Sequence, residues 1–236
     1  MHHLDLTLPN PAENLALDEA LLEEAEAAGE PRETLRIWES DRFVVVLGRS
    51  SRAEAEVDCD ACRALGIPIL RRPSGGGAVL VGPGCLMYAL VLSYRLRPAL
   101  RAVAVAHRTV LGRMAAALAR LVPELHCEGT SDLVLGERKV SGNSLRANRG
   151  HMLYHGTLLY GFPLELVARC LPMPPRQPAY RAGRSHLDFL ANLPVRAAAL
   201  RLALCAAWEA GEPCHDWPRA AVAHLAAARY NDMGLT

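Results

Sequence analysis

The spacing of hydrophobic and polar positions predicts a chain in which helices and strands are interleaved. Apolar residues recur at helical spacing over residues 12–28, 57–65, 100–121, 164–170, 195–210 and 217–229. Short apolar or β-branched runs bounded by turn residues predict strands at 4–8, 35–38, 43–47, 67–70, 86–93, 133–135, 138–141 and 151–159. Such a mixture predicts an α+β fold, in which a mixed, mostly antiparallel sheet is flanked by helices.

Two of these strand pairs are predicted to form hairpins. The first pair, 35–38 and 43–47, flanks three polar residues, Ser40 to Arg42. The second pair, 133–135 and 138–141, flanks Gly136-Glu137, and glycine at the first central position favours a two-residue type II′ turn.

The second hairpin fixes the direction of its side chains. Successive residues of a strand point to opposite faces, so Lys139 and Ser141 share one face and Val140 takes the other. If Val140 packs into the core, Lys139 and Ser141 are free to face a ligand.

Composition narrows the class of protein. The chain has 236 residues, which favours one large domain over 1–236, with a core rich in aliphatic side chains because aromatics make up only 5%. The formal net charge of +1 gives no overall attraction to nucleic acid or to an anionic membrane. The longest apolar run, Cys85–Leu92, is too short to cross a bilayer and predicts a buried strand.

The termini and cysteines indicate the compartment. No basic segment followed by an apolar stretch stands at the N-terminus, so we expect a cytoplasmic protein. Seven scattered cysteines are typical of reduced thiols. The single Cys59-x-x-Cys62 pair has no partner pair, which favours two helix cysteines over a metal site.

A glycine-rich segment follows the strand at 67–70. It reads R-R-P-S-G-G-G-A-V over residues 71–79. Three successive glycines cost about 1 kcal/mol each in conformational entropy, so we expect something to approach this backbone closely. Exposed N–H groups beside two arginines suit a carboxylate or a phosphate.

Three blocks together resemble the lipoate–protein ligase A family, within the group of biotin and lipoate ligases and octanoyltransferases. They are the 71–79 segment, the hairpin from Asp132 to Gly142, and the H-G-T-L-L run at 155–159. Gly48-Arg49 and the N-L-A-L-D-E run at 14–19 are similar to two further motifs. The resemblance implies a mixed sheet of the biotin ligase type.

The resemblance also implies a two-step reaction. The carboxylate of lipoate or octanoate would attack ATP, supplied with Mg²⁺, to give an acyl-AMP. The acyl group would then pass to a lysine of a lipoyl domain or glycine-cleavage carrier protein. Lys139 would be the catalytic cation, because it can sit between two anions. The substrate-binding residues would be Arg49, Arg71, Arg72, Ser74, Gly75, Gly76, Gly77, Ala78, Asp132, Ser141, Gly142, His155, Gly156 and Thr157.

The chain departs from the family pattern in two places. Residues 80–85 read L-V-G-P-G-C, where the family usually has an aromatic residue, His-Asp and an Asn. After the last helix we expect no C-terminal accessory domain, so a separate accessory polypeptide is a candidate partner.

Two alternative functions stay open. An octanoyltransferase would carry the acyl group from an acyl carrier protein as a thioester on Cys127, with Lys139 as base. A noncatalytic protein that binds lipoyl carriers would keep the fold without turnover. Ser74 and Gly77 favour the ligase, because the octanoyltransferases of this group tend to have Thr and Arg at these two positions of the glycine-rich segment.

Other polar residues receive simpler interpretations. A strand histidine usually bonds a neighbouring carbonyl, so His155 is interpreted as structural rather than catalytic. Asp132 either braces the hairpin or contacts ligand. Four arginines are interpreted as surface charges: Arg146, Arg149, Arg181 and Arg184.

Overall fold

Two sheets form the frame of the computed structural model, which describes residues 1–232. The eight-stranded sheet of this part of the chain runs, in spatial order, β11 (Glu212–Pro213), β1 (His2–Asp5), β2 (Thr34–Trp38), β6 (Cys85–Ser93), β10 (His151–Leu159), β9 (Arg138–Ala147), β8 (Asp132–Leu135) and β7 (Leu125–Glu128). The three-stranded sheet runs β4 (Ile69–Arg71), β3 (Val44–Leu47) and β5 (Val79–Val81). Parallel pairing is limited to β1 with its two neighbours and β3 with β4, which confirms a mixed, mostly antiparallel architecture.

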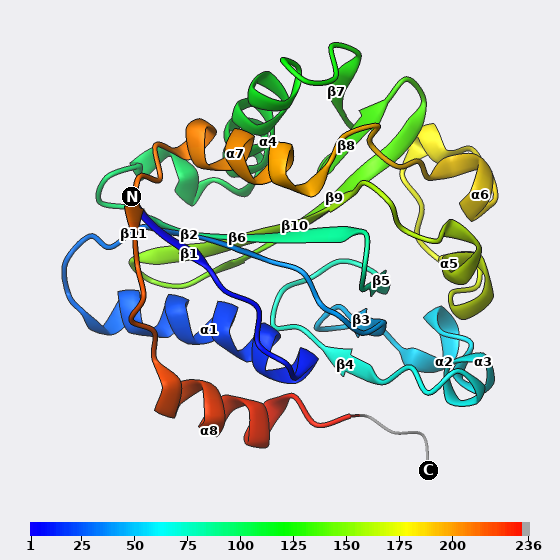
Figure 1. The fold of residues 1–236 in the computed structure, drawn as a ribbon, viewed down its shortest axis with the longest axis horizontal. Helices are drawn as coiled ribbons and strands as arrows, with labels where there is room; N and C mark the ends of the chain where they lie inside the picture. Colours follow the sequence, from blue (N-terminus) through cyan, green and yellow to red (C-terminus); the bar gives the residue numbers. More distant parts are fainter. Residues whose placement is uncertain (233–236) are drawn as a thin grey trace.

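Helices cover both faces of the large sheet (Figure 1). On one face lie α4 (Val103–Leu118) and α7 (Ala197–Trp208), and on the other lie α1 (Pro11–Ala27) and α8 (Arg219–Arg229). The remaining helical segments are α2 (Ala53–Glu56), α3 (Cys59–Ala64), α5 (Leu164–Cys170), α6 (His186–Phe189), η1 (Pro98–Arg101) and η2 (Ala179–Arg181). Within the described residues, no helix is long and apolar enough to cross a membrane.

Strand β6 divides the core into two layers. All nine of its residues are buried, which confirms the run at 85–92 as a buried strand. Leu86 and Leu90 pack with α4 and α7, whereas Met87 and Val91 pack with α1 and the small sheet. A strand buried on both faces needs apolar residues at every position, and this explains the unbroken run.

The predicted hairpin between 35–38 and 43–47 is wrong. Strand β2 pairs with β1 and β6 in the large sheet, whereas β3 pairs with β4 and β5 in the small one. The chain changes sheet at Glu39, whose carboxylate accepts hydrogen bonds from Gly84 N and the Tyr160 hydroxyl. These long-range bonds override the local turn signal.

The other predicted elements exist with shifted ends. The first strand covers 2–5 rather than 4–8, and β9 extends to Ala147. Three strands, β5, β7 and β11, were not predicted, because each has at most four residues and β7 carries exposed polar side chains. Their pairing partners define them, and their own sequence does not.

Helix α1 is held to the large sheet by buried polar groups. Arg36 on β2 is fully buried, and its Nη1 donates to Asp18 Oδ1 at 2.5 Å. Its Nη2 donates to Asn14 Oδ1 at 2.7 Å, and Trp38 Nε1 donates to Asp18 Oδ2 at 3.3 Å. Two residues of the N-L-A-L-D-E run therefore orient the helix.

Asp18→Asn should lower the free energy of unfolding by about 3–5 kcal/mol, because it leaves the Arg36 guanidinium buried without its anion. Urea denaturation measures the change. Glu24→Gln is the control, since Glu24 and Arg32 are 3.4 Å apart and each side chain is 36% exposed. That variant should lose less than about 1 kcal/mol. Equal losses would contradict the anchoring role of Asp18.

Candidate active site

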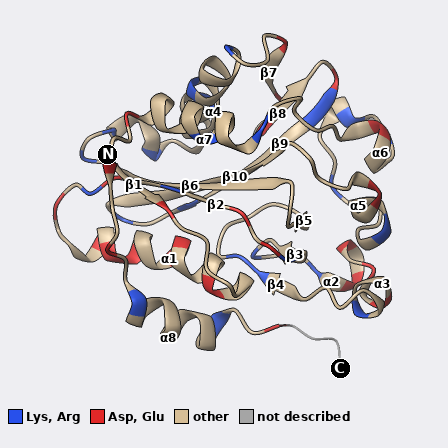
Figure 2. Cartoon of the chain, viewed as in Figure 1, with Lys and Arg blue, Asp and Glu red and all other residues tan. Residues whose placement is uncertain are grey.

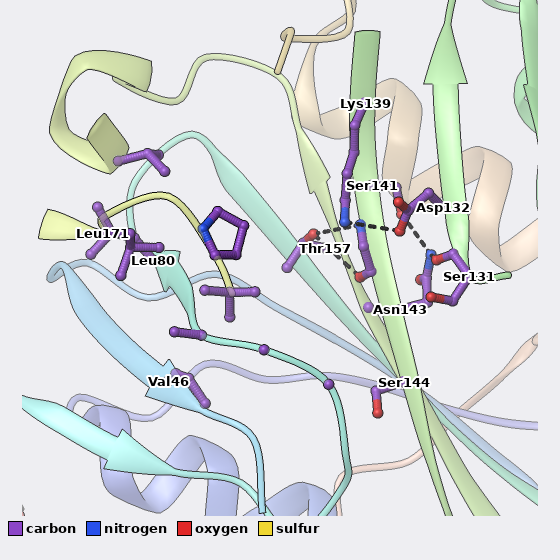
Figure 3. Close-up of a pocket in the computed structure, with 18 of the residues that line it drawn as sticks. Val46, Leu80, Ser131, Asp132, Lys139, Ser141, Asn143, Ser144, Thr157 and Leu171 are labelled. Carbon is purple, nitrogen blue, oxygen red and sulfur yellow. Dashed lines mark hydrogen bonds and ion pairs between the residues drawn. The ribbon is translucent and has the colours of Figure 1, made fainter. Parts of the chain in front are cut away.

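A cavity of about 260 Å³ lies between the small sheet and strands β9 and β10 of the large sheet. One end is apolar, where Val46, Leu80 and Leu171 lie (Figure 3), and further apolar side chains of the wall are Leu15, Met87, Leu159 and Val167. The other end is polar and is lined by Ser131, Asp132, Lys139, Ser141, Asn143, Ser144 and Thr157 (Figure 3). Such a cavity suits a molecule with a hydrocarbon tail and a charged head.

Lys139 is the cation at the polar end. Its Nζ lies 2.8 Å from Asp132 Oδ1 (Figure 3). The other oxygen, Oδ2, accepts a hydrogen bond from the Tyr180 hydroxyl at 2.7 Å. Burial, with Asp132 adding to it, raises the pKa of Tyr180, so this hydroxyl stays a donor. Asp132 therefore both braces the hairpin and touches the site.

The hairpin of β8 and β9 places this lysine as its alternation predicts. Gly136 has φ +58°, as a turn glycine should. Val140 is buried in the core, while Lys139 and Ser141 both line the cavity. At Gly142 a Cβ would lie 3.0 Å from Lys139 Cε and Nζ, so this glycine leaves room for the lysine side chain.

The composition of the chain also singles out Lys139, which a search for motifs would not reveal. Lys139 is the only lysine of the chain, and the other 25 of its 26 basic residues are arginine. A compact ammonium on a flexible stem differs in size and hydration from a guanidinium. That one lysine stands at the polar end of the cavity indicates a requirement for the smaller cation.

Asn143 on β9 bonds to β6 and to the turn between β7 and β8 at the floor of the polar end. Its Nδ2 donates to Ser131 O at 2.8 Å and Ser141 Oγ at 3.0 Å, and its Oδ1 accepts from the Tyr88 hydroxyl. A Cβ at Gly156 would lie 1.7 Å from Asn143 Oδ1. Gly156, the glycine of the H-G-T-L-L run, is therefore required by Asn143, a residue that the sequence analysis did not single out.

Arg72 holds the glycine loop, residues 72–78, which joins β4 to β5. Its guanidinium donates to the carbonyls of Val46, Gly75 and Gly77 and to Ser74 Oγ. Burial lowers the pKa of Arg72 to about 10, so it stays protonated at neutral pH. Most of its donors serve the loop itself.

The glycines of the loop have reasons within the chain. Gly76 has φ +89°, which only glycine adopts readily, and a Cβ on Gly48 would lie 1.9 Å from Gly76 O. At Gly75 a Cβ would meet nothing within 4 Å. The close approach that the sequence predicts comes from Gly48 and from Arg72, whose Nη2 lies 2.8 Å from a Cβ built on Gly76.

His155 fastens this loop to the large sheet. Its Nε2 lies 2.5 Å from Ser74 Oγ, which accepts from Arg72 Nε and therefore donates to the histidine. Burial, helped by the Arg72 charge, lowers the pKa of His155 to about 3. A histidine that stays neutral and bonds a loop hydroxyl supports the structural interpretation.

Most of the predicted site residues meet in this cavity. Those on its wall are Arg72, Gly76, Gly77, Ala78, Asp132, Lys139, Ser141, Gly142, His155, Gly156 and Thr157. Ser74 and Gly75 lie behind the wall, where their bonds shape the loop. Residues 80–85 form β5 and the turn into β6, and Leu80 contributes to the apolar end.

Arg49 and Arg71 lie outside the cavity. They line a separate hollow on the other side of the glycine loop. Arg71 Nη1 donates to the carbonyls of Gly48 and Ser51, each at 2.7 Å, so this side chain fixes the loop after β3. Both residues carry charge near the loop without reaching the cavity.

Two of the four arginines interpreted as surface charges are placed differently. Arg146 pairs with the buried Glu19, and Arg181 is 4% exposed and lines the cavity. Arg149 is exposed, and Arg184 is half-buried. The interpretation is thus wrong for Arg146 and Arg181, since Arg146 pairs with a residue of α1 and Arg181 stacks on the ring of Phe189.

Residues 172–190, here called the cap segment, close one side of the cavity. Arg181 stacks on Phe189, with its Cζ 4.7 Å from the ring centre. Among the buried side-chain N and O atoms of residues 1–232, Arg181 Nη2 alone has no hydrogen-bond partner. The cap segment thus contributes an unpaired buried donor as well as Tyr180.

Cys127 does not share the site. It lies on β7, two strands from Lys139, and it is exposed. Partial burial raises the pKa of its thiol, the opposite of what activates a nucleophile. None of the residues that line the cavity is a cysteine.

Comparisons with known proteins agree with this geometry. Residues 10–194 match the model of the lipoyl protein ligase A/B catalytic domain. Lipoate-protein ligase A subunit 1 of Thermoplasma acidophilum is 28% identical over 191 residues, which are 78% of this chain and 71% of that protein. The octanoyl-[GcvH]:protein N-octanoyltransferase of Kyrpidia tusciae is 33% identical over 172 residues, 62% of this chain and 56% of that enzyme. The chain thus spans just over half the length of the latter.

A solved structure shows the same fold. It is the bipartite lipoate protein ligase of Thermoplasma acidophilum, described with its E2 lipoyl domain. The two folds superpose with a TM-score of 0.80 at 24% identity, over 100% of this chain and 96% of the other. The expected biotin/lipoate ligase type of sheet is confirmed.

The buried, neutral His155 predicts a pH dependence of stability. Below pH 6.5 the unfolded chain protonates this imidazole, whereas the folded chain does so only near pH 3. The folded state therefore loses stability as pH falls, by up to about 1.4 kcal/mol per pH unit from this group. His155→Gln should show a shallower decline in urea unfolding between pH 6.5 and 4.5. Parallel curves for the two proteins would contradict the burial of a neutral histidine.

Proposed function

The chain belongs to the lipoyl protein ligase A/B catalytic domain family, and from this premise we propose that it is an ATP-dependent lipoate–protein ligase. It would activate lipoate or octanoate as an acyl-AMP and pass the acyl group to a lysine of a lipoyl domain or glycine-cleavage carrier. The observation that carries the proposal is a lysine at the polar end of an apolar cavity that contains no cysteine.

The apolar end suits the acyl chain. Its seven aliphatic or thioether side chains come from the small sheet, α1, α5 and the large sheet. Each methylene transferred from water contributes roughly 0.8 kcal/mol. A carboxylate cannot follow the chain into this wall, because a buried charge without a partner is costly. The carboxylate of the ligand is therefore oriented toward Lys139.

Activation brings two anions together, and the cations of the cavity reduce their repulsion. The carboxylate oxygen attacks the α-phosphorus while pyrophosphate leaves. Lys139 is placed to stabilise the charge that builds up in this transition state. Arg181 is a further cation of the cavity wall, and its charge adds to that of Lys139. A thioester donor would need neither.

Transfer completes the reaction. The neutral ε-amine of the acceptor attacks the acyl carbon, the carbon–oxygen bond to AMP breaks, and AMP leaves with the electron pair. One proton leaves the attacking amine. The same ammonium of Lys139 stabilises the departing phosphate.

Magnesium would accompany the nucleotide and neutralise phosphate charge. The carboxylates of the cavity lining do not offer it a free protein site. Asp132 is engaged by Lys139 and Tyr180, and Glu56 accepts from Ala78 N and Ser51 Oγ. The side chains present do not form a metal site of their own, so no step is assigned to the ion.

An accessory polypeptide is the proposed second partner. One relative is named subunit 1 of a ligase, and the solved structure described above is of a bipartite ligase. A separate subunit would supply what the longer relatives carry beyond the matched region.

Octanoyl transfer is the second candidate, because the Kyrpidia relative is an octanoyltransferase. A thioester route needs a reactive thiol beside the acyl group. The position of Cys127 outside the cavity and the raised pKa of its thiol favour the ligase.

Lys139→Met should lower the rate of lipoate-dependent pyrophosphate exchange with ATP by about a thousandfold, because a cation is lost from an anionic transition state. The free energy of unfolding should be measured in parallel, because the substitution also leaves the 8% exposed carboxylate of Asp132 without its cation. Exchange should be measured with lipoate and with octanoate. Near-normal exchange in a folded Lys139→Met protein would exclude the catalytic role.

Cys127→Ser should leave exchange and transfer almost unchanged, because an acyl-AMP needs no protein nucleophile. Intact-mass spectrometry after incubation with octanoyl carrier protein, without ATP, separates the two candidates. An octanoyl adduct on the wild type that disappears in Cys127→Ser would replace the ligase with the transferase.

A further inference from the structure

The proposed reaction creates a hazard at its own centre. An acyl-AMP is made to react with lysine amines, and the Lys139 side chain ends at the polar end of the cavity where the acyl carbon would form. Were its nitrogen neutral, this amine would compete with the acceptor. The site must therefore use the charge of Lys139 while suppressing its nucleophilicity.

We propose that Asp132 protects Lys139 from acylation by the enzyme's own intermediate; this inference rests on the proposed function. Asp132 Oδ1 lies 2.8 Å from Nζ, and its side chain is only 8% exposed. The ion pair holds the charged Lys139 nitrogen against the carboxylate, and an ammonium has no lone pair with which to attack an acyl carbon. The acceptor amine carries no such partner when it enters.

Tyr180 is the positioning residue for this protection. Its hydroxyl occupies the second oxygen of Asp132 at 2.7 Å, which limits rotation of the carboxylate. Tyr180 in turn packs on Phe189, with ring centres 5.2 Å apart. The cap segment thereby keeps the carboxylate turned toward Lys139.

The unwanted reaction is simple to write. A neutral Lys139 nitrogen attacks the acyl carbon, the carbon–oxygen bond to AMP breaks, and AMP leaves with the electron pair. The nitrogen loses a proton and an amide remains. The product lacks the cation, so each such event would inactivate one molecule of enzyme.

The composition of the chain makes the inference easy to test. Lys139 is its only lysine, so the α-amine of Met1 is the only other amine. An octanoyl amide, as distinct from a thioester on a cysteine, can therefore be assigned to one of two places by fragmentation.

Asp132→Asn should acquire one octanoyl group on Lys139 when treated with synthetic octanoyl-AMP. Asparagine is similar in size but cannot hold the ammonium by charge. The initial rate should exceed that of the wild type by about tenfold or more, which corresponds to about 1.4 kcal/mol. Intact-mass spectrometry followed by peptide fragmentation measures the adduct. The double variant Asp132→Asn/Lys139→Met should gain none at this position.

Arg176→Lys and Arg108→Lys are control variants, which measure whether the acyl-AMP modifies a new lysine near the cavity faster than one far from it. Both arginines are exposed, but Arg176 lines the cavity and Arg108 lies on α4, across the large sheet. With ATP and octanoate, Arg176→Lys should be acylated faster than Arg108→Lys. That result would show that an amine near the cavity is modified when it has no carboxylate partner like Asp132.

Tyr180→Phe keeps the test valid if Asp132→Asn does not fold. It retains the ring on Phe189 and removes one hydroxyl, so its rate of Lys139 acylation should lie between wild type and Asp132→Asn. Equal acylation of Lys139 in the wild type and in folded Asp132→Asn or Tyr180→Phe would overturn the inference. Pyrophosphate exchange by the wild type is scored separately, so failure of the proposed function is distinguishable from failure of the protection.

Discussion

One buried guanidinium fixes the glycine loop that lies between the two sheets, and this loop forms one wall of the cavity. Arg72 follows the last residue of β4 and donates hydrogen bonds to the backbone of β3 and of the glycine loop. Ser74 of that loop is hydrogen-bonded to His155 on β10 of the large sheet. Ser144 of β9 adds a further bond to Gly75 O. Burying a charge is costly unless its hydrogen bonds are made, so the loop has little freedom to move away from the large sheet. The width of the cavity follows from this constraint.

The architecture and much of the site were predictable from local signals. Periodicity placed α1, β6, α5 and the β8–β9 hairpin correctly, because each buries a face whose pattern is visible in the sequence. Three motif blocks converge on the cavity, as their order in the family suggests. What was missed depends on distant partners: the separation of β2 from β3, the pairing of Arg146 with Glu19 and the role of Asn143. No spacing along the chain reports a contact made across it.

The two ends of the cavity differ in charge. The apolar side chains offer no partner to a carboxylate, whereas Lys139 stands at the polar end beside Asp132, and Arg72 and Arg181 are further buried cations of the wall. A fixed field of this sort needs no rearrangement when charge develops on a substrate. The glycines at 142 and 156 serve the same arrangement, since each leaves room for a polar side chain.

Helix α8 affects the order in which the protein can assemble. Its Arg229, with Tyr230 just beyond it, bonds Glu19, which is 1% exposed on α1, and α1 contributes Leu15 to the acyl cavity. During synthesis on the ribosome, Glu19 therefore cannot form these bonds until residues more than two hundred positions later in the chain have been made. Contacts of such separation are slow to form, and a nascent chain lacks them altogether. The cavity that α1 helps to line is therefore held in its final form only after residues 219–230 have been made.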